Sequence, residues 1–106
     1  MEIETRRGEG APVHRTTIWA VVDSGDVFVR SLKGPNARWY RELMSDPAAV
    51  LHAQAEEFPV QAVQAGDPES VERTSEALRR KYSDSRSLAS MLDDEILDTT
   101  VRLEPR

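Results

Sequence analysis

Residues 16–41 read TTIWAVVDSGDVFVRSLKGPNARWYR. Two apolar runs flank an Asp-Ser-Gly-Asp turn, which is typical of a pair of antiparallel strands. A Lys-Gly-Pro-Asn loop then leads into a segment with apolar residues at helical spacing. Residues 27–41 hold four cations and no acid, although the whole chain has a formal net charge of -5. A cationic glycine loop before a helix start is typical of an anion-binding site.

The run from Val13 to Val22 is the strongest predicted strand. Ile18, Ala20 and Val22 alternate with Thr17, Trp19 and Val21, so both faces of the strand are largely apolar. In so short a chain, a strand covered on both faces predicts a barrel wall with a helix or a partner subunit outside it.

The other elements follow from periodicity and turn residues. Besides the strand at 13–22, strands are predicted at 2–7, 27–32, 49–53, 58–63 and 99–103. One helix begins at an Asn36 cap and stops at Asp46-Pro47, a second begins at an Asp67 cap, and a short third covers 87–92. Trp39 and Tyr40 are adjacent on the first helix, so only one of them is expected to face inward. This order predicts an α+β fold with an antiparallel sheet and few helices.

Composition limits the class of protein. The chain has 106 residues, which predicts a single domain over 1–106, and its 39% hydrophobic and 31% charged residues predict a soluble globular protein. The absence of cysteine excludes disulfides and thiolate chemistry and suits a reducing cytoplasm. The start MEIETRRGEG lacks the apolar core of a signal peptide, and no apolar run reaches membrane-spanning length. A pI near 5.0 argues against general nucleic-acid binding.

No catalytic or metal-binding motif is present at diagnostic spacing. His14 and His52 are the only histidines, and neither belongs to a His-x-x-His or Glu-x-x-His pattern, so no metal site is expected. There is no Gly-x-Ser-x-Gly elbow. The acids at 56–57 and 93–95 are contiguous, which is typical of a solvated face rather than of a separated acid–base pair.

The cationic segment admits two interpretations. In the first, the loop at 31–37 wraps an oxyanion: Gly34 lets the backbone approach, and Arg30, Lys33 and Arg38 neutralise the charge. In the second, these cations form a solvated surface or pair with the acids at 93–95. Trp19, Trp39 and Tyr40 are either flat walls for a planar ring or ordinary core aromatics.

The segment TTIWAVVDSGDVFVRSLKGPNARWYREL resembles the "TIW-V…G-D-(V/L)-(F/Y)-V-R-S…G-P…W-(F/Y)-R" signature of the bacterial family called domain of unknown function 2255. The endings LRRKY at 78–82 and TTVRLEPR at 99–106 also match that family, so the resemblance covers most of the chain. The family is similar to the FMN-binding split β-barrel superfamily, which includes pyridoxamine-phosphate-oxidase-like proteins and deazaflavin-dependent nitroreductases. The resemblance implies a small antiparallel split β-barrel with two or three flanking helices.

The resemblance also implies a homodimer that binds FMN or the deazaflavin F-420 at its interface, with hydride transfer performed by the cofactor. By position, the candidates for the phosphate side are Arg30, Ser31, Lys33, Gly34 and Arg38. The candidates for the ring side are Thr16, Thr17 and Trp19. The alternative is a cofactor-free split barrel that binds another anionic small molecule or a protein partner. The sequence departs from the expected pattern at 53–57, where Ala-Gln-Ala-Glu-Glu replaces a glycine-rich hairpin.

Overall fold

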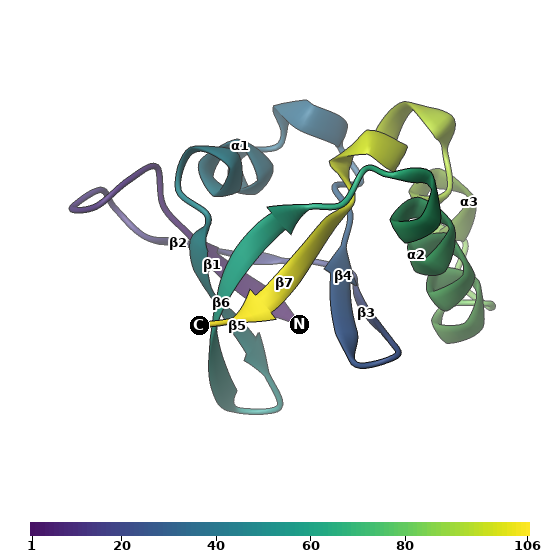
Figure 1. The fold of residues 1–106 in the computed structure, drawn as a ribbon, viewed down its shortest axis with the longest axis horizontal. Coiled ribbons are helices and arrows are strands. Elements are labelled where there is room, and N and C mark those ends of the chain that lie inside the picture. The colour runs from purple at the N-terminus through teal and green to yellow at the C-terminus, as the bar shows by residue number, and fades with distance from the viewer.

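Seven strands form one antiparallel sheet in the computed structural model, which describes residues 1–106 (Figure 1). The strands are β1 (Glu2–Thr5), β2 (His14–Thr17), β3 (Ala20–Asp23), β4 (Asp26–Val29), β5 (Ala48–Ala53), β6 (Glu56–Gln64) and β7 (Val101–Pro105). Their order across the sheet is β2-β1-β5-β6-β7-β4-β3, and every neighbouring pair is antiparallel. The α+β class and the antiparallel split barrel predicted from the sequence are therefore confirmed.

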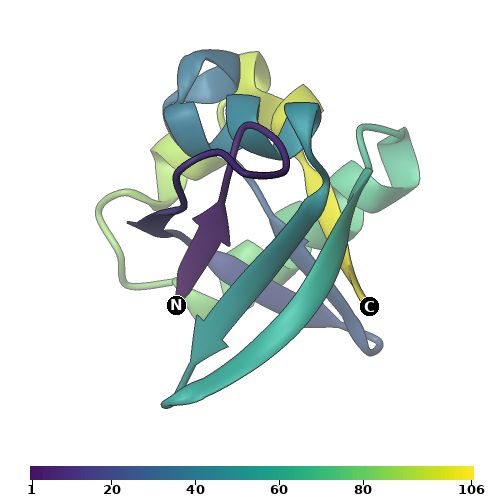
Figure 2. The same ribbon diagram turned by 90° about the vertical axis from the view of Figure 1, so that its left-hand side faces the viewer.

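The sheet curls because its two edge strands are consecutive in the chain. β2 and β3 lie at opposite ends of the strand order, yet only Ile18 and Trp19 separate them. Three Cα–Cα steps reach at most about 11 Å, so the two edges must approach each other at this point. Figure 2 shows the resulting half-closed barrel, with the β5–β6 hairpin crossing in front of β3 and β4. The single strand predicted over 13–22 is wrong in this respect, because the chain changes edges at Ile18.

Both faces of the edge-changing segment are nevertheless covered from Ile18 to Val21, whereas Val22, predicted on the same face as Ile18 and Ala20, is 56% exposed. Ile18 and Ala20 belong to the core cluster inside the barrel, whereas Val21 belongs to a second cluster. The apolar residues on the two faces of this segment therefore belong to two separate hydrophobic clusters. The barrel cluster consists of Ile3, Ile18, Ala20, Val29, Trp39, Tyr40, Leu43, Ala49, Leu51, Val60, Val101 and Leu103.

The helices are α1 (Arg38–Ser45), α2 (Pro68–Lys81) and α3 (Leu88–Met91), with 3-10 turns η1 (Gly34–Asn36) and η2 (Asp94–Thr99). The predicted Asp67 cap of α2 is confirmed, since its carboxylate accepts a hydrogen bond from the Ser70 N–H. The predicted Asn36 cap is wrong: η1 ends at Asn36, and Ala37 caps α1 without a side-chain bond. Gly34, at φ +74°, and the following proline form a separate turn before the helix. η2 was not predicted from the sequence. None of the helices combines the length and apolar character that crossing a membrane requires.

α1 closes one end of the barrel and buries both of its aromatic side chains. Trp39 is 7% exposed and Tyr40 is 9% exposed, and their ring centroids lie 6.1 Å apart in an edge-to-face arrangement. The expectation that only one would face inward is wrong, because more than one face of α1 is covered. Burial, with a smaller contribution from the charge of Asp98 on η2, raises the pKa of Tyr40.

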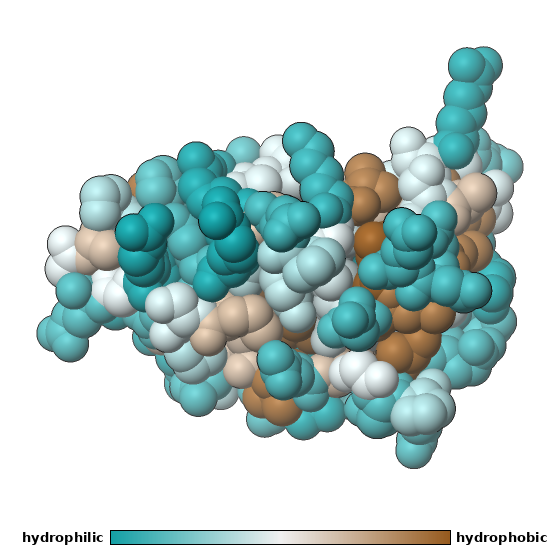
Figure 3. All heavy atoms as spheres, turned by 90° about the horizontal axis from the view of Figure 1, so that it is seen from above, coloured by the Kyte–Doolittle hydropathy of each residue, from teal (hydrophilic) through white to brown (hydrophobic).

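The second core cluster lies outside the barrel, between the β3–β4 hairpin and α2. It joins Val21 and Phe28 to Ala77 and Leu78 of α2 and to Met91 of α3. Partly buried leucines of the α3 segment pack against this cluster. The view from above shows hydrophobic atoms gathered toward the α2–α3 end, whereas much of the remaining face is hydrophilic (Figure 3). The domain thus has a barrel layer and a helical layer.

The β5–β6 hairpin is strained at its tip. Gln54 and Ala55 have φ angles of +52° and +66°, a region that favours glycine, and the segment forms a two-residue hairpin loop. The sequence departure at 53–57 therefore leaves the hairpin in place but with residues that its turn disfavours.

We expect Ala55→Gly to stabilise the fold by about 1 kcal/mol, because it removes the strain of a Cβ atom in the left-handed region. Glycine also raises the conformational entropy of the unfolded chain, which offsets part of this stabilisation. Thermal unfolding should show a melting temperature higher by about 4–8 °C. Ala53→Gly in the adjacent strand is the matched control and should be destabilising. An unchanged or lower melting temperature for Ala55→Gly would contradict the strain.

Candidate functional site

A cavity of about 340 Å³ opens where the β2–β3 junction meets the β4–α1 loop and α3. Small-molecule sites have volumes of about 300–1,000 Å³, so the cavity is large enough for a small ligand or for part of a larger one. It is lined by Thr16, Thr17, Ile18, Trp19, Arg30, Leu32, Lys33, Ala37, Arg38, Trp39 and Met91. We call it the cationic cavity.

Six of the eight residues predicted from the sequence line this cavity: Thr16, Thr17, Trp19, Arg30, Lys33 and Arg38. The other two, Ser31 and Gly34, are buried beside it and bond to each other. The Ser31 hydroxyl donates to the Gly34 carbonyl at 2.6 Å, and the Gly34 N–H donates to the Ser31 carbonyl at 3.0 Å. These two residues therefore shape the loop, and the donors expected of them are already in use.

The cavity lining contains three cations and no carboxylate. Lys33 and Arg38 are exposed, and neither takes part in any ion pair of the structure. The acids at 93–95, the alternative partners considered above, form no ion pair with them either. The cavity therefore carries uncompensated positive charge, which favours an anion.

Arg30 supplies the buried part of this charge. Its side chain is 1% exposed, and its guanidinium donates to the hydroxyls of Thr100 at 2.9 Å and Ser75 at 3.1 Å. It also donates to the carbonyls of Met91 at 3.0 Å and Val71 at 3.1 Å. All four acceptors are neutral. Burial, with a smaller contribution from the charge of Arg79, lowers the pKa of Arg30 to about 10, so the guanidinium remains charged at neutral pH.

Arg30 has a structural role that the sequence prediction did not include. Its four bonds join β4 to α2, to the end of α3 and to the start of β7. One face of α2 carries a buried serine, Ser75, because the guanidinium needs an acceptor there. At most one N–H of Arg30 is left for a ligand, so its main influence on the cavity is its charge.

Aromatic side chains line the cavity on two elements. Trp19 comes from the β2–β3 junction and stacks on Tyr82, with ring centroids 4.3 Å apart. Trp39 comes from the first turn of α1. These are the only two tryptophans in the chain, and both line the cavity. Their fluorescence is therefore a direct reporter of its contents.

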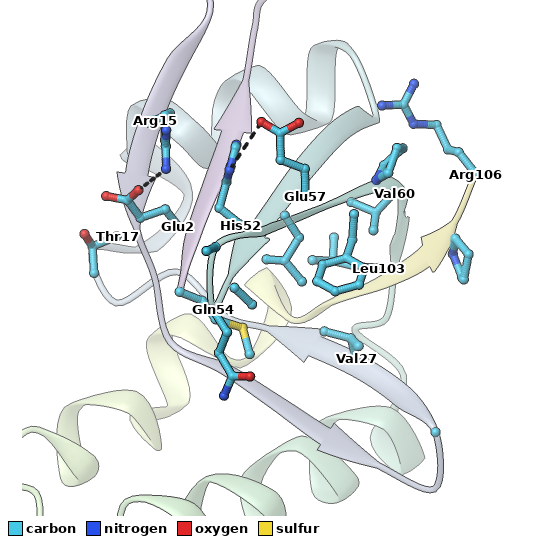
Figure 4. Close-up of a pocket in the computed structure, with 18 residues that line it drawn as sticks. Glu2, Arg15, Thr17, Val27, His52, Gln54, Glu57, Val60, Leu103 and Arg106 are labelled. Carbon is cyan, nitrogen blue, oxygen red and sulfur yellow. Dashed lines mark hydrogen bonds and ion pairs between the residues drawn. The ribbon is translucent and has the colours of Figure 1, made fainter.

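A second, larger hollow of about 1510 Å³ lies on the open side of the half-barrel (Figure 4). Its walls include apolar side chains such as Val27, Phe58 and Leu103, and its rim includes Arg15 and Arg106. We call it the barrel groove. Thr17 lines both hollows. The sequence did not predict this groove, because its walls come from strands that are far apart in the chain.

Comparison with known proteins identifies the family. Residues 1–103 match the family described as an uncharacterised protein conserved in bacteria, DUF2255. The chain belongs to this family. The resemblance to this family, carried mainly by residues 16–43, is therefore confirmed over residues 1–103. No protein of curated function is similar enough in sequence to match it.

Solved structures with the same fold have low sequence identity to the DUF2255 protein. The conserved hypothetical protein Rv2991 from Mycobacterium tuberculosis has a TM-score of 0.67 and 18% identity over 96% of this chain and 68% of its own. HutZ, described as a heme storage protein from Vibrio cholerae, has a TM-score of 0.71 and 15% identity over 99% of this chain and 80% of its own. A structure described as a domain-swapped dimer has a TM-score of 0.70 and 14% identity over 96% and 76%. These likenesses establish the split-barrel fold.

Proposed function

We propose that the DUF2255 protein is a ligand-binding split barrel whose cationic cavity holds a phosphate-bearing small molecule. The observation that carries this proposal is the convergence of Arg30, Lys33 and Arg38 on one cavity without a carboxylate. A buried cation with only neutral partners has an unfavourable solvation energy, which a bound anion offsets.

The lining residues divide into two groups by chemistry. Lys33 and Arg38 are exposed, have no partners, and would donate charge-assisted hydrogen bonds to a phosphate. Trp19 and Trp39 would contact a planar ring, with the hydroxyls of Thr16 and Thr17 as polar contacts at its edge. Ser31 and Gly34 hold the loop that carries Lys33.

Within this proposal the cofactor candidates are FMN and the deazaflavin F-420. Each joins a phosphate to a planar ring system, which suits cations beside tryptophans. When bound, such a cofactor supplies hydride transfer, while the protein contributes binding, orientation and charge. No side chain of the cavity is assigned a catalytic role. An oxidoreductase activity would therefore depend on loading of the cavity.

The alternative function is a cofactor-free module that binds another anionic small molecule or a protein partner. The same cations favour this alternative, because they attract any negatively charged ligand whether or not it carries a planar ring. Nucleic acid, membrane and metal ligands form no part of either proposal for this cavity. We place the protein in the cytoplasm, on the composition described above.

A homodimer is part of the proposal. The barrel groove leaves apolar side chains uncovered, and Phe58 is 43% exposed. A second copy would cover such a groove, and one structural neighbour is described as a domain-swapped dimer. Sedimentation equilibrium should then give twice the mass of the 11.9 kDa chain.

Tryptophan fluorescence tests the proposed function directly. Purified protein is titrated with FMN, F-420, pyridoxal phosphate and inorganic phosphate, and heme is included because one structural neighbour is a heme storage protein. We expect saturable quenching by at least one phosphate-bearing ligand, because both tryptophans line the cavity.

The outcomes of this titration separate the candidates. Saturation by FMN or F-420 supports the cofactor-binding function, whereas saturation by a phosphate compound without a flavin ring supports the alternative module. Quenching by heme alone would contradict the proposal that the ligand bears a phosphate. No saturable response to any of these probes would overturn the proposal.

A further inference from the structure

Three potential metal ligands converge on neighbouring strands of the sheet. Glu4 lies on β1, His52 on β5 and Glu57 on β6. His52 is the register partner of Glu2 on β1 and of Glu57 on β6, so Glu2, His52 and Glu57 share one face of the sheet. Glu4 lies two residues after Glu2 and projects from that same face.

The donor atoms are close together. The Nε2 atom of His52 lies 2.6 Å from Oε1 of Glu4, and its Nδ1 atom lies 3.8 Å from Oε1 of Glu57. One donor atom from each of the three side chains lies within 4.8 Å of the other two. Figure 4 shows the His52 and Glu57 side chains pointing toward each other beside the barrel groove. Metal–ligand bonds of about 2.0–2.2 Å place donor atoms about 3 Å apart. One ion can bind only one imidazole nitrogen, so the carboxylate beside the other nitrogen has to turn toward the ion.

Neither carboxylate forms an ion pair with an arginine or a lysine. His52 is the only basic group within ion-pair distance of either Glu4 or Glu57. Arg15 is the register partner of Glu4, but its guanidinium bonds to Glu2 at 2.5 Å instead. Two carboxylates that share one site repel each other unless a cation lies between them. A metal ion between them would supply that positive charge, and the imidazole offers it a nitrogen ligand.

We propose that Glu4, His52 and Glu57 bind a divalent transition-metal ion at the edge of the barrel groove. One imidazole nitrogen and two carboxylate oxygens suit Zn²⁺, Co²⁺ or Mn²⁺ better than a softer ion, since the chain has no thiolate. Three protein ligands leave at least one coordination position open, as in metal sites that bind water or a substrate. The His52 side chain is 12% exposed and that of Glu57 is 71% exposed, and both residues line the barrel groove, so solvent can reach the site.

The site is separate from the cationic cavity, with which it shares no residue. Residue spacing in the sequence does not reveal it, because positions 4, 52 and 57 come together only through strand pairing. The metal proposal and the phosphate proposal can therefore fail independently.

Untagged protein stripped with a chelator tests the metal site. Calorimetry with Zn²⁺ should give one saturable site per chain, and Co²⁺ should produce visible absorption bands of a nitrogen–oxygen complex. Glu57→Gln should weaken Zn²⁺ affinity by about tenfold or more, because it removes one ligand. This exposed side chain can change without disturbing the core. His14→Gln is the matched control and should leave the affinity unchanged, since His14 pairs with Glu42 on a different element.

Nuclear magnetic resonance of the two imidazole rings gives a test that needs no variant. Addition of Zn²⁺ should shift the His52 ring signals and leave those of His14 in place. The proposal is overturned by an absence of saturable Zn²⁺ binding, by binding that Glu57→Gln leaves intact, or by ring shifts confined to His14. Each of these outcomes would leave His52 as a side-chain partner of Glu4 and Glu57 and nothing more.

Discussion

Arg30→Ala is expected to lower the free energy of unfolding by about 3–5 kcal/mol, which is a large fraction of the stability of a small domain. The change leaves two carbonyls and two hydroxyls without their donor, and it opens a void between β4 and α2. Urea denaturation followed by circular dichroism measures the effect. The midpoint should fall while the slope stays close to that of the wild type.

Arg79→Ala is the matched control for Arg30→Ala. Arg79 is an exposed arginine on α2, and its positive charge repels that of Arg30, so its removal should change stability by no more than about 0.5 kcal/mol. Arg30→Lys keeps the charge but replaces a planar fork with a single ammonium group, so it should give an intermediate loss. Near-wild-type stability of Arg30→Ala would contradict the structural role.

The same arginine links the fold to the proposed function. Its side chain forms hydrogen bonds with α2, with α3 and with Thr100 before β7, and it also lines the cationic cavity. A ligand anion would therefore improve the electrostatic environment of the residue that holds the helical layer. Ligand binding should raise the melting temperature through mass action.

The sequence predicted the strands and helices well where local patterns govern them. Pro68 after the Asp67 cap marks the start of α2 without help from the rest of the chain. The break at Ile18 was missed because its cause is not local: the chain there leaves one edge of the sheet and joins the other. Alternation of side chains continues across the break and conceals it.

The candidate cavity was largely predictable because most of its lining is contiguous in sequence. Lys33 and Arg38 lie on one loop–helix segment, so a run of cations without acids reveals them. The contribution of Met91 was not predictable, since α3 reaches the cavity only through tertiary packing. Arg30 lines the cavity, but its bonds to α2, α3 and Thr100 could not be predicted, because the acceptors lie 41 to 70 residues away in the chain.

The double substitution Lys33→Glu/Arg38→Glu should weaken binding of any phosphate-bearing ligand by at least about 100-fold. Each lost charge-assisted hydrogen bond contributes about 1.5–3 kcal/mol, and every 1.4 kcal/mol is a factor of ten in affinity. Both side chains are exposed and form no ion pair, so the fold should lose no more than about 0.5 kcal/mol. Tryptophan fluorescence titration gives the affinity, and urea denaturation gives the stability.

Arg41→Glu/Arg86→Glu separates a local effect from a change in overall charge. Both of these arginines are exposed and neither lines the cavity, yet the double substitution changes the net charge by the same amount. We expect this control to bind within a few-fold of the wild type, because neither arginine lines the cavity that holds the ligand. Equal losses in the two double variants would mean that long-range charge attracts the ligand and that Lys33 and Arg38 hold no phosphate. A loss confined to Lys33→Glu/Arg38→Glu would assign the phosphate to the loop before α1.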